Sequence, residues 1–403
     1  MRSVVLTVWF FINVVLLGMC GYIYLLWLQY WHHITIKNQQ AKEAAYTQQP
    51  YVEYYDEGDV TTVHQSVNMI NSLMHINEVY LDKTEKIRLF NFKNKIIARL
   101  RQVIMKESSY YGSVKNENPY DVPYRPQASN NVNSDWMCDM ASNMEQFRTL
   151  EKNDIDHELT KNIPDIPLFN DNEIYGTCAI ISNAATLRNS NLGSFIDQHD
   201  LVLRFNNAPT KGYEKDVGSK TTIRILNSQV VSKPQFQFVS SPLYKRLKLL
   251  MWDPSNYTTS IDEWIKKPEH NFIDNYVKFR KNIPKSNFHI VHPQYLWRLW
   301  DYIQDHTTAH IRRNPPSSGF LGLSMLLPRC TVVNMFEFIP SERMTHRCHY
   351  YHEKIDVTCT FGIWHPLAAE KLLMLAGNTK PDQTVFHTGF LSIPGYKSPL
   401  CTA

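Results

Sequence analysis

The sequence lacks a strong net charge. Its 42 Lys and Arg residues and 38 Asp and Glu residues leave a formal charge of +4 over 403 residues. A strongly basic nucleic-acid-binding protein is therefore excluded as the first interpretation, and no nucleic-acid partner is predicted. With 43% hydrophobic and 20% charged residues, the chain is neither disordered throughout nor a multi-span membrane protein. A large globular part is expected.

Common nucleotide and metal motifs are also missing. No G-x-G-x-x-G occurs, and residues 212–221 (GYEKDVGSKT) lack the glycine spacing of a P-loop. The D-x-D tripeptide at Asp154 follows a polar run instead of an apolar strand, so we interpret it as a chance match. A Cys/His cluster between His346 and His365 has enough ligands for zinc, but we expect its thiols to be oxidised. No metal site is predicted.

Neither cysteine nor tryptophan occurs between residues 32 and 135. The polar residues 34–59 have no core-forming period and are typical of an extended stalk. Residues 87–105 have apolar positions at helical spacing, which predicts a helix packed on the domain or on a partner, with a membrane-surface helix as the alternative. We therefore expect a stem over residues 29–135 and one folded domain over residues 136–403.

An apolar run from Val4 to Leu28 contains no Asp, Glu, Lys, Arg or His. It is long enough to cross a membrane, for which about 20 residues suffice, and longer than the apolar part of a cleaved signal peptide. We predict a transmembrane signal-anchor at residues 4–28 after a cytoplasmic tail of residues 1–3. A cleaved signal or a buried helix is the alternative.

The cysteines outside this run are even in number. An even set behind a signal-anchor is typical of disulfides in an oxidising lumen, and the single N-x-S/T site at Asn256 is compatible with that side of the membrane. The residues alone leave the pairing open. The six are Cys138, Cys178, Cys330, Cys348, Cys359 and Cys401.

From residue 177 onward, short apolar runs alternate with stretches of helical period. This alternation predicts an α/β domain with a single, mainly parallel, doubly wound sheet. The expected strands are 177–182, 201–205, 223–226, 247–252, 288–291 and 331–338, and the expected helices are 192–199, 294–306 and 319–327.

Compact polar residues follow four of the expected strands: Asn183, Asn206, Asn227 and Asp253. Ligands bind beyond the carboxyl ends of such strands, so a nucleotide or a sugar is expected there, with ordinary turn chemistry as the alternative. The stretch from Asn314 to Gly319 (NPPSSG) precedes an expected helix. Its serines can cap that helix and expose amides to a phosphate, although an ordinary capped helix would look the same.

Four stretches resemble motifs of one family. Cys178–Arg224 resembles the large sialylmotif of the animal sialyltransferases, glycosyltransferase family 29, and Asn314–Glu337 resembles the small one. His349-Tyr350-Tyr351 is similar to the third motif, and His365 with Glu370 matches the H-x4-E motif. The motifs stand in the family's order over about 190 residues, and NPPSSG with the residues around Asn227 and Trp252 looks most like the β-galactoside α-2,6 class.

The resemblance implies a variant GT-A, Rossmann-type fold and transfer of sialic acid from CMP-sialic acid to terminal galactose in α-2,6 linkage. It implies inversion and no metal or other cofactor. The acceptors would be galactose-terminated glycoproteins or glycolipids, and the protein would be a type II Golgi membrane protein with a luminal catalytic domain, compatible with a homodimer. Open alternatives are α-2,3 or α-2,8 linkage, a GalNAc acceptor, or an inactive glycan-binding homologue.

The resemblance also implies residue roles. His365 would be the general base, which suits a side chain with a pKa near 6.5; His349 would contact the leaving phosphate and Glu370 would support the site. The α-2,6 enzymes usually have Tyr, Asp and Tyr where His349, Glu269 and Trp364 stand here. The implied donor-site residues are Asn183, Asn206, Asn227, Ser317, Ser318, Gly319, His349, Thr360, Trp364, His365 and Lys371; the acceptor residues are Gln229, Glu269 and Trp364; the disulfides are Cys138–Cys401, Cys178–Cys330 and Cys348–Cys359.

Overall fold

The structure is a computed structural model that describes residues 81–111, 136–144, 146–155, 158–258, 260–307, 309–356, 358–362 and 364–396. The chain divides into two units, Met1–Val60 and Thr61–Ala403, and the described residues all belong to the second. The expected membrane span at 4–28, the expected stalk and Cys401 lie outside them. No helix among the described residues is both long and apolar enough to cross a membrane.

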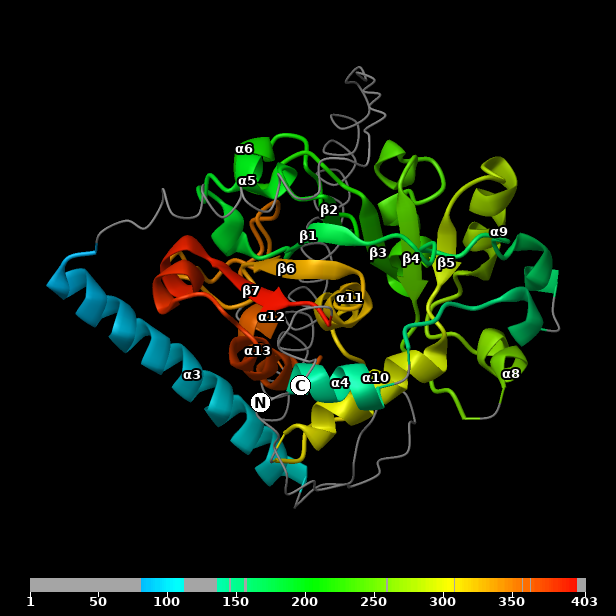
Figure 1. The fold of residues 1–403 in the computed structure, drawn as a ribbon. Helices are drawn as coiled ribbons and strands as arrows, with labels where there is room; N and C mark the ends of the chain where they lie inside the picture. The colour runs from blue at the N-terminus through cyan, green and yellow to red at the C-terminus, as the bar shows by residue number, and fades with distance from the viewer. Residues whose placement is uncertain are drawn as a thin grey trace, which may run out of the picture. The chain divides into compact units, whose positions relative to one another are not determined.

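A seven-stranded sheet forms the centre of the second unit, in the order β5-β4-β3-β2-β1-β6-β7 (Figure 1). Every neighbouring pair is parallel except β6 and β7. The predicted, mainly parallel sheet is therefore confirmed, and the antiparallel edge strand β7 is an addition. The strands are β1 Tyr175–Ile181, β2 Leu201–Phe205, β3 Ile223–Asn227, β4 Lys248–Trp252, β5 Phe288–Ile290, β6 Cys330–Phe336 and β7 Phe390–Pro394.

Helices cover both faces of the sheet. Alternate residues of β1 show this, because Ile180 packs in a core with α10 and α11, whereas Ile181 packs in a separate core with α5 and α6. Burial on both faces explains why the strands read as continuous apolar runs. The α-helices are α3 Lys83–Tyr111, α4 Trp136–Asn143, α5 Gly193–Asp197, α6 Glu214–Val217, α7 Ser228–Ser232, α8 Ile261–Lys266, α9 Ile273–Asn282, α10 Pro293–Asp305, α11 Ser318–Leu326, α12 Thr358–Phe361 and α13 Leu367–Ala376.

Helix α11 is almost completely enclosed by the fold. All its residues from Gly319 to Leu326 are buried, and it contacts β1, β2, β3 and β6. A helix that is apolar all round must be buried. Gly322 allows the close approach, since a Cβ there would lie 2.6 Å from the side chain of Leu203. The sheet therefore fixes the position of α11 and of its first turn.

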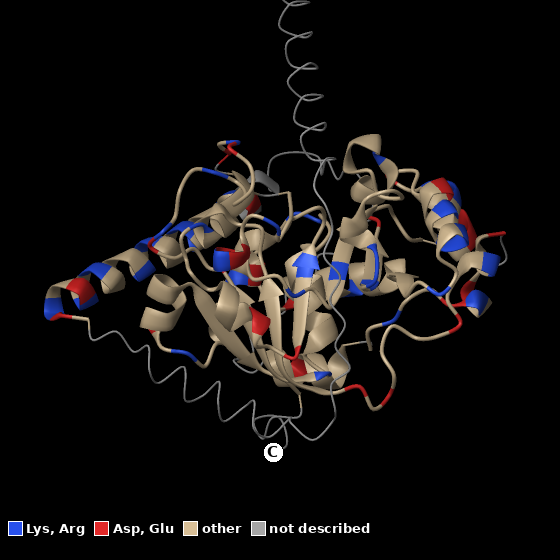
Figure 2. Cartoon of the chain, turned by 90° about the horizontal axis from the view of Figure 1, so that it is seen from above, with Lys and Arg blue, Asp and Glu red and all other residues tan. Residues whose placement is uncertain are grey.

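Helix α3 packs against α13 through buried side chains that include Leu89, Ile96 and Leu100. Figure 1 shows it as the long helix beside α13, and Figure 2 shows Lys and Arg along its length. Arg88 pairs with Glu342 at 3.0 Å. The helix expected at residues 87–105 is predicted to pack on the domain or on a partner. The structure shows it packed on the domain.

Two disulfides lie within the domain, one between distant positions of the chain and one local. Cys178 on β1 bonds Cys330 on β6, and Cys348 bonds Cys359. Both are pairings that the family resemblance implies. The third implied pair, Cys138–Cys401, involves a residue outside the described part of the chain.

Candidate active site

A cavity of about 220 Å³ opens where the carboxyl ends of β1, β2 and β6 meet. Asn183, Asn206 and Glu337, which follow these strands, line it. The chain runs outward from β1 to β5 and then returns to β6 on the other side of β1, so the cavity lies at the topological switch point of the sheet. Open α/β sheets bind their ligands at this place.

The first turn of α11 points into the cavity and is anchored by Glu370. The Ser317 amide donates to Glu370 Oε1 at 2.7 Å, and the Ser317 hydroxyl donates to Oε2 at 2.5 Å. The same hydroxyl accepts from the Phe320 amide at 3.2 Å. Ser317 therefore has no free hydrogen-bonding proton, and its role is to hold α11 against α13.

Ser318 has the opposite arrangement. Its hydroxyl accepts a hydrogen bond from the Trp252 indole Nε1 at 2.8 Å, and because an indole N–H only donates, the Ser318 proton stays free to donate. Within the described residues, the amides of Ser318 and Gly319 have no hydrogen-bond acceptor. A Cβ at Gly319 would lie 2.1 Å from the Phe338 ring. These donors at a helix N-terminus form an anion site.

His365 lies beside this turn, and its hydrogen bonding selects one tautomer. Its Nδ1 is 2.7 Å from the carbonyl oxygen of Pro315, so Nδ1 carries the proton and Nε2 keeps its lone pair. Burial lowers the pKa of His365 to about 4, with a further decrease from the Lys371 ammonium. The imidazole is therefore neutral at pH 7.

Lys371 and Glu370 are neighbours on α13, and both line the cavity. Burial lowers the pKa of Lys371 to about 8 and raises the pKa of Glu370. Lys371 remains largely charged at pH 7, which adds a cation to the donors of α11.

The opposite rim carries His349. The Tyr350 amide donates to the carbonyl of Asn183 at 3.1 Å, and the His349 and Tyr351 rings stack with centroids 5.1 Å apart. Burial lowers the pKa of His349 to about 4, and the nearby His352 lowers this pKa further. The Cys348–Cys359 disulfide adjoins both His349 and Thr360, so it holds these two predicted residues at one rim.

Asn206 is held by a buried cation. It has a left-handed backbone with φ 50°, and Arg224 Nη1 donates to its carbonyl at 2.8 Å and to that of Ala208 at 3.0 Å. The Asn206 Oδ1 accepts from the Asn227 amide at 3.1 Å. The ends of β2 and β3 are thereby joined at the cavity.

Comparison with known proteins identifies the family. Residues 124–376 match the model of glycosyltransferase family 29 (sialyltransferase). The chain belongs to this family. It is 46% identical over 245 residues to β-galactoside α-2,6-sialyltransferase 2 of Gallus gallus, covering 60% of this chain and 46% of that protein. For the Danio rerio protein of the same name the identity is 38% over 294 residues, covering 71% and 56%.

The chain spans about half the length of the curated relatives that it matches. Among solved structures, a mammalian sialyltransferase crystal structure is 22% identical and covers 67% of this chain and 88% of that one, with a TM-score of 0.38.

Most of the residues that the family motifs predict line the one cavity. They are Asn183, Asn206, Ser317, Ser318, Gly319, His349, Thr360, His365, Glu370 and Lys371. Asn227, Gln229, Glu269 and Trp364 are not part of its lining.

These four residues lie elsewhere, with Gln229 on α7. The Asn227 side chain caps α7 by accepting from the Val230 amide at 3.1 Å. The exposed Glu269 is held through its amide, which donates to Asp253 at 3.1 Å. Trp364 precedes His365 in the chain and is 55% exposed, and Asn256, the expected glycosylation site, is half-buried after β4.

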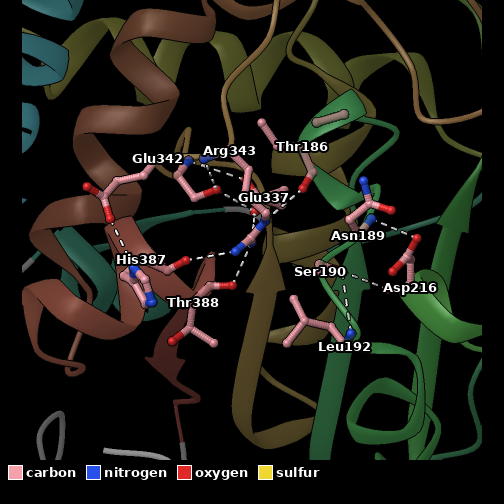
Figure 3. A network of polar contacts seen from close by, with 12 residues as sticks. Thr186, Asn189, Ser190, Leu192, Asp216, Glu337, Glu342, Arg343, His387 and Thr388 are labelled. Atoms are coloured by element: carbon pink, nitrogen blue, oxygen red, sulfur yellow. Dashed lines mark hydrogen bonds and ion pairs between the residues drawn. The ribbon is translucent and has the colours of Figure 1, made fainter. Parts of the chain in front are cut away.

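The family motifs do not single out Glu337, which lines the cavity as the centre of a polar network (Figure 3). Glu337 is buried, pairs with Arg343 and accepts from the Ser341 hydroxyl at 2.8 Å. Arg343 also donates to the carbonyl oxygens of Thr186 at 3.0 Å and Thr388 at 2.7 Å. One ion pair therefore ties β6 to the turn after β1 and to the segment before β7.

Arg347 is a second lining residue that sequence reasoning missed. It pairs with Glu353 at 2.7 Å, and the same carboxylate pairs with Arg188 at 3.1 Å. One carboxylate serves two guanidinium groups, so this rim carries excess positive charge. Within the described residues, no group of three or more His, Cys, Asp or Glu is placed to hold a metal ion.

Proposed function

We propose that this protein transfers sialic acid from CMP-sialic acid to terminal galactose of glycoproteins or glycolipids, forming an α-2,6 linkage with inversion and without a metal. One observation carries the proposal: His365, with Nε2 unprotonated, shares a cavity with the free donors of Ser318 and Gly319. The names of the relatives in two species support the α-2,6 linkage and the galactoside acceptor.

The donor carries two negative charges, on its phosphate and on its sialic acid carboxylate. The N-terminal donors of α11 would receive the phosphate, and Lys371 and Arg347 supply cations in the same cavity. Fixed donors stabilise charge that develops on a leaving group. CMP leaves as a phosphate monoester, so this set of donors can take the place of a metal ion. Asn183 and Asn206 offer amide groups to the nucleoside.

In the reaction, the acceptor's 6-hydroxyl oxygen forms a bond to the anomeric carbon of sialic acid. The bond from that carbon to the phosphate oxygen breaks, CMP takes the electron pair, and His365 Nε2 takes the hydroxyl proton. A bound phosphate raises the pKa of a nearby imidazole, so donor binding would make His365 a stronger base than it is in the empty cavity. Trp364, Gln229 and Glu269 would contact the galactose.

The proposal extends to the location of the protein. A signal-anchor at residues 4–28 and a stem over residues 29–135 would hold a luminal catalytic domain at the Golgi membrane. Disulfides are typical of such oxidising compartments, and the two disulfides of the described domain fit this location.

The test is an assay of the purified full-length protein in detergent with CMP-sialic acid and N-acetyllactosamine. The expected product is α-2,6-sialyllactosamine, identified by NMR, with a rate unchanged by EDTA. An α-2,3 product would refute the linkage. If CMP binds but no galactoside is sialylated, the proposed transfer to galactose is refuted.

A further inference from the structure

A second cavity, of about 690 Å³, lies at the amino-terminal ends of the parallel strands. Thr222, Lys248 and Asn287, which line it, stand at the beginnings of β3, β4 and β5. The candidate active site stands at the carboxyl ends of β1, β2 and β6. Since these strands are parallel, the two cavities are at opposite ends of the sheet, and no residue lines both.

The lining of the second cavity contains five cations and no Asp or Glu: Lys220, Lys245, Arg246, Lys248 and Lys285. Two of them have fixed partners, because Lys220 Nζ donates to the His199 carbonyl at 2.7 Å and Lys248 pairs with Glu173. Lys245 and Lys285 are exposed and form no ion pair with the described residues. They belong to different connections, one before β4 and one before β5, so they can approach a ligand from two sides.

Three hydroxyl groups in the lining can also donate hydrogen bonds to a ligand. Each already accepts a hydrogen bond of 3.1 Å: Thr221 from Arg204 Nε, Thr222 from the Val202 amide, and Ser286 from Arg280 Nη1. None of the three donates to another described residue. An oxygen that accepts from an N–H keeps its proton for another partner. The hydroxyls and the ammonium groups therefore all offer protons, and the complementary ligand is an oxyanion.

The cavity is larger than a single oxyanion requires. Its volume lies within the range of about 300–1,000 Å³ typical of small-molecule sites. Apolar side chains complete its lining, with Tyr244 and Phe279 buried and Leu247 and Ile283 half-buried. Sugar rings combine apolar faces with hydroxyl groups, and substituted sugars carry sulfate or carboxylate groups at repeating distances.

We propose that this cavity binds an anionic oligosaccharide, whose sulfate or carboxylate groups are held by Lys245, Lys285 and the three hydroxyls. The site is separate from the catalytic cavity and does not depend on the proposed transferase function. A glycan bound there would attach the enzyme to anionic glycoconjugates while the catalytic cavity stays open.

The test uses the full-length protein in detergent and isothermal titration with three hexasaccharides: sulfated heparin-derived, carboxylated hyaluronan and neutral chitohexaose. At least one anionic probe should bind, more weakly at higher salt, and chitohexaose should not. Preference for the heparin or the hyaluronan probe identifies sulfate or carboxylate as the recognised group. Equal binding of the neutral probe, or no binding of either anionic probe, would overturn the proposal.

Charge reversal locates the site. Lys245→Glu with Lys285→Glu should weaken binding of the anionic probe more than tenfold. The matched control, Lys83→Glu with Lys95→Glu, changes the net charge equally on exposed positions of α3 and should change affinity less than twofold. Equal losses in both double variants would show nonspecific attraction and overturn the proposal.

Hydrogen exchange of the wild-type protein provides a measurement that no folding defect can affect. The bound probe should protect amides at residues 219–222, 244–248 and 284–287, and saturating CMP should not displace it. Protection of Ser318 and its neighbours instead would place the glycan in the catalytic cavity and refute the second site.

Discussion

The indole nitrogen of Trp252 donates a hydrogen bond to the Ser318 hydroxyl at 2.8 Å. This contact joins the end of β4 to the first turn of α11, and the Trp252 ring also lies edge-on to His365, with centroids 6.1 Å apart. One buried side chain therefore contacts both the anion site and the candidate base. It also determines which way the Ser318 proton can point.

Trp252→Phe keeps an aromatic ring beside His365 but removes the N–H donor. The Ser318 hydroxyl can then turn away from the phosphate, and the loss of one hydrogen bond of about 0.5–1.5 kcal/mol should raise the KM for CMP-sialic acid roughly 2- to 10-fold. Steady-state kinetics measure this change. Trp264→Phe is the control, because the buried Trp264 indole N–H has no partner among the described residues; equal effects in both variants would contradict the assignment.

The two serines of the α11 turn should respond differently to removal of the hydroxyl. Ser317→Ala leaves the buried Glu370 without one of its donors, at a cost of about 1–3 kcal/mol in the free energy of unfolding. Ser318→Ala removes no bond to a buried carboxylate, although it leaves the Trp252 N–H without its acceptor, so it should cost less stability than Ser317→Ala and mainly weaken CMP-sialic acid binding. Urea unfolding and titration with CMP separate the two effects, and equal stability losses would be inconsistent with this division.

Stability should decrease as the solution becomes acidic. Burial lowers the pKa of His199, His289 and His365 to about 4, below the value of about 6.5 in the unfolded chain. Between these values the unfolded state binds protons that the folded state does not, so the free energy of unfolding is highest above about pH 6.5 and falls toward pH 4.

Urea unfolding at pH 7.5, 6 and 5 tests this sign. His289→Gln should make the dependence on pH shallower, whereas the same substitution at the exposed His346 should leave it unchanged. A free energy of unfolding that stays constant or rises between pH 6.5 and 5 would refute the expectation.

Helix α3 should contribute to stability through one face only. Ile96 is 2% exposed and Ile87 on the same helix is 54% exposed. Ile96→Ala should lower the free energy of unfolding by about 2–5 kcal/mol, and Ile87→Ala should change it by less than about 0.5 kcal/mol. Thermal and urea unfolding measure both. Similar losses in the two variants would show that α3 does not pack on α13 as described.

The core strands could be predicted because burial on both faces makes each strand an uninterrupted apolar run. The run at residues 201–205 coincides with β2. Strand β7 gives a weaker signal, since Phe390–Pro394 is a short edge strand that contains a serine and ends in a proline. Its antiparallel pairing with β6 depends on a contact between residues far apart in the chain.

The candidate site could be predicted where a polar residue follows a strand or where the family motifs supply a role, as at Asn183 and His365. Glu337 was missed because the expected strand 331–338 runs through it. The structure ends β6 at Phe336 and turns Glu337 to φ 53°, which aims a residue that looked like part of the strand at the cavity. The bond between Trp252 and Ser318 joins positions 66 residues apart, and no local pattern encodes it.

The hydrogen bond from His365 to the Pro315 carbonyl has a consequence for catalytic geometry. Pro315 and Pro316 directly precede the α11 turn, and each proline fixes its own φ angle. If this turn moves, the Pro315 carbonyl moves with it, and so does the hydrogen bond between that carbonyl and His365. In the proposed reaction, the separation between the proton acceptor and the departing phosphate would be set by a stiff three-residue segment, Pro315–Ser317, and would stay the same whichever glycan presents the galactose.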